Sequence, residues 1–118
     1  MIICAMTIIR FAIAAALLMS PVAALAGASG FSIVNQSGSP LSGLSLRRTG
    51  SSDWHPLGAG LSPGASSKYS FTDPDCAFDI KATLAGSGEA VWRGVNLCEV
   101  ASVTLQRDAT GATWVDYD

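Results

Sequence analysis

Residues 76–98, CAFDIKATLAGSGEAVWRGVNLC, hold two apolar, strand-like segments that flank the glycine-rich stretch 85–88 and carry a cysteine at each outer end. In the first segment apolar residues occupy every second position, which is the period of a strand with one buried face. Two such segments joined by a short Gly-containing turn are typical of a β-hairpin. The residues that this pattern places on the solvent face are Ala77, Asp79, Lys81 and Thr83.

The two cysteines of this hairpin predict a disulfide bond. Folding the hairpin back on itself places Cys76 opposite Leu97 or Cys98, depending on the length of the turn, and both registers bring the two sulfurs within bonding reach. The return strand contains two apolar sets of opposite parity. A bulge near Gly94 would reconcile them, because glycine is the usual residue at such a break.

The N-terminal segment has the composition of a secretory signal peptide. An unbroken apolar run covers residues 11–19, Arg10 precedes it, and residues 24–26 form an Ala-x-Ala cleavage site. The apolar run is too short for a transmembrane helix, which needs about 20 residues. We therefore expect a cleavable signal peptide at 1–26 and a single domain at 27–118. The product would be periplasmic or secreted, with no membrane span after cleavage.

The expected mature domain is small and weakly acidic. Removal of the leader takes away Arg10, so six basic residues remain against nine acidic ones, a formal charge of −3. It also takes away Cys4, and the remaining pair, Cys76 and Cys98, suits an oxidising compartment. Scattered acidic charge gives no electrostatic footprint for nucleic acid, so nucleic acid is excluded as a partner.

The rest of the chain consists of short alternating segments separated by Gly, Pro, Ser and Asp clusters, and none has a helical period of any length. This pattern is typical of an all-β sandwich. We predict a small antiparallel β-sandwich of about seven strands. Besides the hairpin, the expected strands cover residues 31–34, 44–47, 68–71, 102–106 and 113–117. Residues 54–57 are either a short edge strand or a loop, because Pro56 interrupts them.

Five short motifs extend this interpretation over nearly the whole domain. They are Phe31–Asn35 with Ser37-Gly38, Asp53-Trp54 with Leu57-Gly58, Leu61–Gly64, Cys76–Ile80 and Val95–Cys98. In this order and spacing the set resembles a family of small exported bacterial proteins with no assigned activity, often labelled only by their signal peptide. The resemblance implies export and a compact β-sandwich with paired cysteines. It carries over no catalytic residue.

Asp53, Trp54 and His55 form the candidate ligand or partner surface. In a strand Asp53 and His55 point the same way, so His55 could act as a general base or metal ligand that Asp53 orients. The sequence marks no residue as the nucleophile that His55 would activate. The same pattern is equally explained by a histidine without a catalytic role on an exposed loop beside Pro56. A small periplasmic hydrolase using His55 and Asp53 is therefore an alternative function.

Carboxylates near the expected turns suggest a second alternative, a calcium-dependent adhesion-type module. Asp73 and Asp75 are its candidate ligands, since Ca²⁺ prefers carboxylate oxygens. The Asp-Pro-Asp sequence is equally a good turn. The further aspartates weighed for such a site are Asp79, Asp116 and Asp118.

Two other groups of residues have structural explanations. Arg47 and Arg48 end an expected strand, so their side chains diverge and form no basic patch. The tryptophans at positions 54, 92 and 114 either form an aromatic platform or contribute to the core, and we expect at least two in the core.

By elimination, the sequence indicates an exported, disulfide-stabilised β-sandwich that binds an unknown protein or envelope component. No cofactor is implied, and no enzymatic activity is expected.

Overall fold

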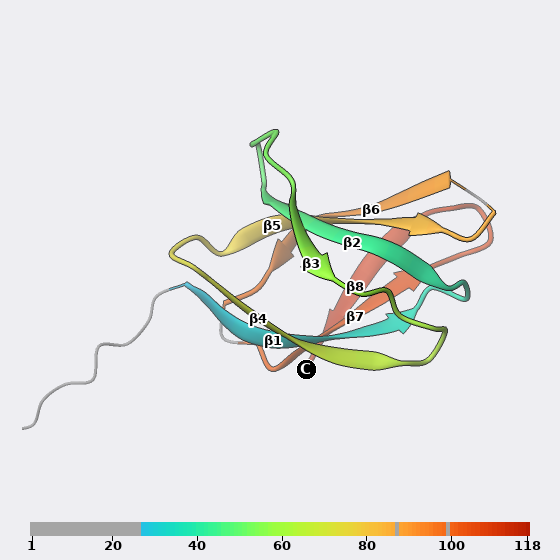
Figure 1. Cartoon of the computed structure of the whole chain (residues 1–118), viewed down its shortest axis with the longest axis horizontal. Helices are drawn as coiled ribbons and strands as arrows, with labels where there is room; N and C mark the ends of the chain where they lie inside the picture. Colours follow the sequence, from blue (N-terminus) through green and yellow to red (C-terminus); the bar gives the residue numbers. More distant parts are fainter. Residues whose placement is uncertain (1–26, 87, 99) are drawn as a thin grey trace, which may run out of the picture.

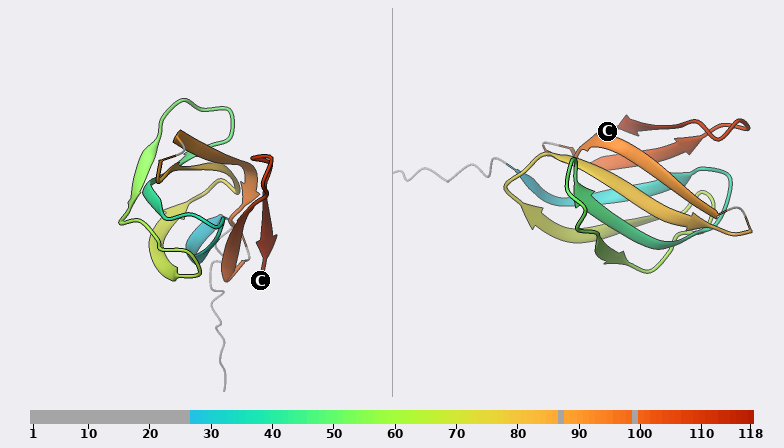
Figure 2. Two further views of the ribbon diagram at one scale, coloured as in Figure 1. Left: turned by 90° about the vertical axis from the view of Figure 1, so that its right-hand side faces the viewer. Right: turned by 90° about the horizontal axis from the view of Figure 1, so that it is seen from above.

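The computed structural model describes residues 27–118 with the exception of Ser87 and Glu99, so the predicted signal peptide at 1–26 lies outside the described residues. Eight strands form two four-stranded sheets that pack face to face (Figures 1 and 2). The all-β sandwich is confirmed, with eight strands instead of about seven. The strands are β1 (Ala28–Gln36), β2 (Leu41–Arg48), β3 (His55–Gly58), β4 (Ser66–Asp73), β5 (Ala77–Leu84), β6 (Gly88–Asn96), β7 (Ser102–Arg107) and β8 (Thr113–Tyr117).

The strand order is β4-β1-β7-β8 in one sheet, sheet A, and β3-β2-β5-β6 in the other, sheet B. Neighbouring strands are antiparallel with one exception, because β1 and β7 run parallel from Ser32 opposite Ser102 to Gln36 opposite Gln106. The predicted antiparallel pairing is found at the other five pairs, and this pair differs from it. A parallel pair requires a long connection, and the segment from β2 to β6 provides it between β1 and β7. Among the described residues no helix is long and apolar enough to span a membrane.

Alternating apolar side chains of both sheets fill the space between the layers. Branched and aromatic residues suit strands because they pack well on a half-buried pleated surface. Burying one such side chain contributes about 1.5–3 kcal/mol, so this layer is the main source of stability. The large side chains with less than 2% exposure are Phe31, Ile33, Leu44, Leu46, Phe78, Ile80, Leu84, Trp92, Val95, Leu97, Val103 and Leu105.

The predicted hairpin is formed by β5 and β6. Its register shifts between Phe78 and Ile80, where the facing strand contains Gly94 with a φ of 63°. The bulge expected near Gly94 is therefore confirmed, and it explains the two parities of the return strand. Glycine suits this position because side chains disfavour a positive φ.

The disulfide expected at the open end of the hairpin is present. Cys76 and Cys98 are bonded with a Cα–Cα distance of 5.2 Å. The amide of Leu97 donates a hydrogen bond of 2.9 Å to the carbonyl of Cys76, which selects the register with Cys76 opposite Leu97. Cys98 also bridges to Ala28 at the start of β1, so the bonded end of the hairpin is joined to sheet A.

Only one of the three tryptophans lies in the core. Trp92 is 1% exposed, whereas Trp114 is 46% exposed. Trp54 is half-buried and lies in the loop between β2 and β3. The prediction of at least two core tryptophans is therefore wrong. Trp114 faces outward because its neighbour Val115 takes the inward position opposite Leu105 on β7.

The two lateral sides of the sandwich differ in how they are closed. On one side, hydrogen bonds join β6 of sheet B to β7 and β8 of sheet A. They run from Trp92 Nε1 to Gln106 O (2.8 Å), from Thr113 Oγ1 to Val91 O (2.8 Å) and from Asn96 N to Tyr117 Oη (2.8 Å). On the other side β3 faces β4, and Tyr69 Oη donates a longer bond of 3.4 Å to Ala59 O. The candidate site lies on this second side.

Candidate functional site

An open pocket of about 310 Å³ lies where the end of β2, the loop after it and β3 face the end of β4. Three of the residues singled out in the sequence, Asp53, His55 and Asp73, line this pocket together. Trp54 and Asp75 do not line it. This volume is at the small end for ligand pockets, which measure about 300–1,000 Å³. The lining residues are Arg48, Ser51, Asp53, His55, Phe71, Asp73 and Phe78.

Two phenyl rings form the apolar part of the pocket. The ring of Phe71 meets that of Phe78 edge to face, with 5.4 Å between the centroids, and packs at 6.3 Å against Phe31 in the core. Phe78 is 1% exposed and Phe71 is half-buried. The pocket therefore opens directly above the hydrophobic core, and its floor is held by core packing.

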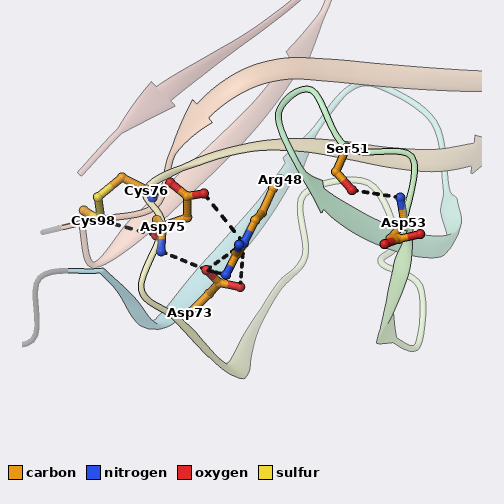
Figure 3. A network of polar contacts seen from close by, with 7 residues as sticks. All are labelled: Arg48, Ser51, Asp53, Asp73, Asp75, Cys76 and Cys98. Carbon is orange, nitrogen blue, oxygen red and sulfur yellow. Dashed lines mark hydrogen bonds and ion pairs between the residues drawn. A yellow bond between two sulfur atoms is a disulfide. The ribbon is translucent and has the colours of Figure 1, made fainter.

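One wall consists of an arginine held by two carboxylates (Figure 3). Arg48 Nη2 lies 3.0 Å from Asp73 Oδ1, and Arg48 Nε lies 3.6 Å from Asp75 Oδ2. The amide of Asp75 donates a further bond of 2.8 Å to Asp73 Oδ1. The two carboxylates considered as calcium ligands thus pair with a guanidinium. Within residues 27–118, Ser87 and Glu99 aside, no three His, Cys, Asp or Glu side chains form a group that could hold a metal ion.

The contacts in this wall determine the pKa of the Asp73 carboxyl. Burial raises the pKa of Asp73, but the bond from Asp75 N, the hydrogen bond and charge of Arg48, and the charge of His55 together bring it below its ordinary value. Asp73 therefore stays ionised at neutral pH and keeps Arg48 in place.

The disulfide supports the same wall from behind. The carbonyl of Asp75 accepts a hydrogen bond of 3.2 Å from Ala28 N and lies 3.7 Å from Cys98 Sγ. The amide of Cys76 donates to Asp75 Oδ1 at 3.2 Å. The turn that carries Asp73 and Asp75 is therefore fixed by the bonded end of the hairpin, as Figure 3 shows.

The opposite wall is the loop between β2 and β3. Here Ser51 Oγ accepts a hydrogen bond of 3.0 Å from the amide of Asp53, and the chain enters β3 at the exposed His55. In the described part of the chain, the His55 imidazole forms no hydrogen bond with Ser51 or Asp53. Asp53 likewise has no ion-pair partner there. The two residues proposed for a hydrolase share one pocket, but the structure holds no bonded nucleophile–base pair.

Trp54 points to the other side of this loop. Its ring lies on the outer face of sheet B, with Arg47 Cζ at 4.5 Å and Lys81 Nζ at 4.4 Å from the ring centroid. A cation above an aromatic face is attracted by about 0.5–2 kcal/mol, depending on desolvation. Trp54 therefore fixes the loop to sheet B and does not line the pocket, although it belongs to the predicted surface.

Asp79 corrects the sequence prediction most clearly. It was expected on the solvent face but is only 3% exposed. Its carboxylate accepts hydrogen bonds from Arg47 Nε (3.0 Å), Thr49 Oγ1 (3.0 Å) and Gly94 N (2.9 Å). Burial raises the pKa of Asp79, but these three bonds and the charge of Arg47 outweigh burial and lower it. Asp79 does face away from the core, and the Arg47 side chain and the loop cover it.

The side chains of Arg47 and Arg48 diverge as predicted, and each contacts a different side of the structure. Arg47 lies opposite Asp79 on the outer face, whereas Arg48, opposite Phe78, faces the pocket. Sequence reasoning did not assign Arg48, Ser51, Phe71 or Phe78 to a site. The local signal was limited to alternation along β2, because the partners of Arg48 come from β4 and the turn after it.

No protein-family model and no curated protein sequence matches the chain. A solved structure, the NMR structure of a protein from Eubacterium rectale, matches with a TM-score of 0.52 and 14% sequence identity, covering 76% of this chain and 87% of that chain. At this identity the likeness shows the fold alone. The resemblance to a family of exported bacterial proteins stays a prediction.

Proposed function

We propose that the protein is an exported binding module that holds part of its partner in the pocket between β3 and β4. The observation that carries the proposal is that both walls of the pocket are fixed while polar atoms of its lining stay unused. Arg48 and the disulfide-supported turn fix one wall, and Trp54 fixes the other. Asp53 and His55 then present a carboxylate and an imidazole from a fixed loop, which is the condition for selective binding.

Export is the second part of the proposal. The Cys76–Cys98 disulfide is compatible with an oxidising compartment, where such bonds form and persist. Together with the predicted signal peptide at 1–26, it supports a periplasmic or secreted binding module. The partner proposed is a protein or another component of the cell envelope.

A small hydrolase is the alternative, because Ser51, Asp53 and His55 line one pocket. It requires a nucleophile and a base about 2.6–3.2 Å apart, at least once substrate is bound. Binding needs no such contact and agrees with the lining as it stands. The calcium-dependent alternative requires Asp73 and Asp75 to exchange Arg48 for a metal ion, and that exchange would remove the fixed wall.

The proposal is tested by site-specific photo-crosslinking in the native cell envelope. A benzophenone amino acid replaces Ser51 in the pocket or, as the control, Asp116, which is exposed on β8. We expect a discrete cross-linked product from position 51 that is absent at 116 and that disappears with Arg48→Ala. Equal products from both positions, or none from 51, would refute the pocket as the binding site.

The hydrolase alternative is tested in parallel. Oxidised protein and His55→Ala are compared on chromogenic ester, peptide and glycoside substrates. Turnover that disappears in a folded His55→Ala variant would replace the binding proposal with the hydrolase.

A further inference from the structure

We infer that the pocket binds a positively charged group, a guanidinium or an ammonium, carried by its ligand. This inference rests on the proposed function, since it specifies what the binding pocket recognises.

The first argument is the charge balance of the lining. Arg48 is the one arginine or lysine among the lining residues, and it pairs with both Asp73 and Asp75. Asp75 lies outside the lining, so within the pocket the charge of Arg48 is balanced by Asp73. Asp53 adds a second lining carboxylate from the opposite wall, and the described residues provide it with no ion-pair partner. With His55 neutral, the lining carries a net charge of −1. Figure 3 shows Asp53 set apart from the network around Arg48. An incoming cation therefore meets an uncompensated negative charge.

The second argument is the floor. The half-buried ring of Phe71, which packs edge to face on the buried ring of Phe78, provides aromatic surface in the floor of the pocket. Aromatic faces attract cations and repel anions, and a desolvated setting strengthens the effect. The same protein already makes this contact on the other side of the loop, where Arg47 and Lys81 lie on Trp54.

The third argument is size. A pocket of about 310 Å³ is at the lower limit for a whole small-molecule ligand. It is large enough for one cationic head group with the methylenes that lead to it. Methylenes would lie on the Phe71 ring while the charged end reaches Asp53. This is how lysine and arginine side chains divide between apolar and polar surroundings.

The inference is tested by titrating ¹⁵N-labelled, oxidised protein with small probes and following amide shifts by NMR. The probes are N-acetyl-arginine methylamide, agmatine as a free small cation, and the neutral, nearly isosteric N-acetyl-citrulline methylamide. We expect the two cations to shift the amides of Ser51, Asp53 and His55 with millimolar affinity, since one head group supplies little binding energy. The citrulline probe should bind about tenfold more weakly, because a charge-assisted hydrogen bond is lost.

The matched variants are Asp53→Asn and Asp116→Asn, which remove the same charge inside and outside the pocket. Asp53→Asn should weaken binding of both cations about tenfold, whereas Asp116→Asn should leave it unchanged. Equal binding of arginine and citrulline probes, equal effects of the two variants, or shifts outside the pocket would each overturn the inference.

The probes and the cross-linking separate the two proposals. If a partner is captured at position 51 and the cations do not bind, the pocket remains a binding site and its preference for cations is refuted. If agmatine and the peptide-like probe bind equally, a free cation suffices. Tighter binding of the peptide-like probe identifies a basic side chain of a protein partner.

Discussion

Replacing Asp79 by alanine should destabilise the fold strongly, although sequence alternation places this residue on the solvent face. Removing one partner of a buried ion pair costs about 3–5 kcal/mol, because the other charge is left without compensation. The Arg47 side chain is 23% exposed and can turn to water, so we expect the lower end, about 3 kcal/mol. The amide of Gly94 and the hydroxyl of Thr49 also lose their acceptor.

The measurement is thermal and urea unfolding of the oxidised protein, followed by tryptophan fluorescence. In a domain of this size 1 kcal/mol corresponds to about 4–8 °C, so the midpoint should fall by about 12 °C or more. Asp79→Asn keeps the shape and an acceptor for Gly94 N and should lose roughly half as much. Asp116→Asn, on the exposed strand β8, is the control and should lie within about 0.5 kcal/mol of the wild type.

The pH dependence gives the same prediction a second signature. The pKa of Asp79 is lowered by folding, so its stabilisation is present above the unfolded pKa of about 3.9 and is lost as the pH falls towards the folded value. The difference between wild type and Asp79→Ala should therefore narrow below about pH 4. A midpoint for Asp79→Ala within 2 °C of the wild type at pH 7, or a difference independent of pH, would refute the reasoning.

Three further predictions concern the hairpin. In the double variant Cys76→Ser with Cys98→Ser, the free energy of unfolding measured in urea should fall by about 3 kcal/mol, because the disulfide joins cysteines that are 22 residues apart in the sequence. An unchanged free energy of unfolding would mean that the disulfide does not stabilise the fold. Trp92→Phe should lower the free energy of unfolding in urea by about 2 kcal/mol, since it removes core volume and the hydrogen bond to Gln106 O. A loss below about 0.5 kcal/mol would contradict the role of Trp92 in joining the sheets. Gly94→Ala should lower the free energy of unfolding by about 1–2 kcal/mol, because alanine disfavours the positive φ of this position. Calorimetry that shows no such loss would mean that the bulge does not lie at Gly94.

The hairpin could be predicted from the sequence because its information is local. The alternation from Cys76 to Leu84, the glycine-rich turn and the two cysteines all act within one segment, and the structure has the same pairing and the same bond. Gly94 could be identified as the bulge because two parities on one strand require an extra residue.

The environment of Asp79 could not be predicted in this way. The alternation of apolar and polar residues along a strand predicts which face a side chain lies on, and Asp79 does point away from the core. Its burial depends on Arg47 and on the loop that carries Thr49, which cover the outer face of sheet B. One usable signal was cross-strand pairing, since Arg47 lies directly opposite Asp79, but that register was known only from the structure.

Three of the residues that line the pocket could be singled out from the sequence, but the pocket itself could not. Asp53 and His55 were recognised from their spacing, and Asp73 from its place in a turn. That all three meet was not visible, because β3 and β4 belong to different sheets and no periodic pattern relates their edges. Residues that are adjacent in the sequence need not share a surface. Asp53 lines the pocket, whereas the side chain of Trp54 lies on the opposite side of the loop.

The parallel pairing of β1 with β7 sets the order in which this chain can fold. β1 lies inside sheet A, between β4 and β7, and β7 is the seventh of eight strands. A chain that emerges N-terminus first therefore presents β1 long before its second neighbour exists. The intervening stretch can form the β5–β6 hairpin and its disulfide early, as local contacts form fastest. Closure of sheet A must wait for Ser102–Arg107, so the half-paired β1 is the segment most exposed to wrong pairing during biogenesis.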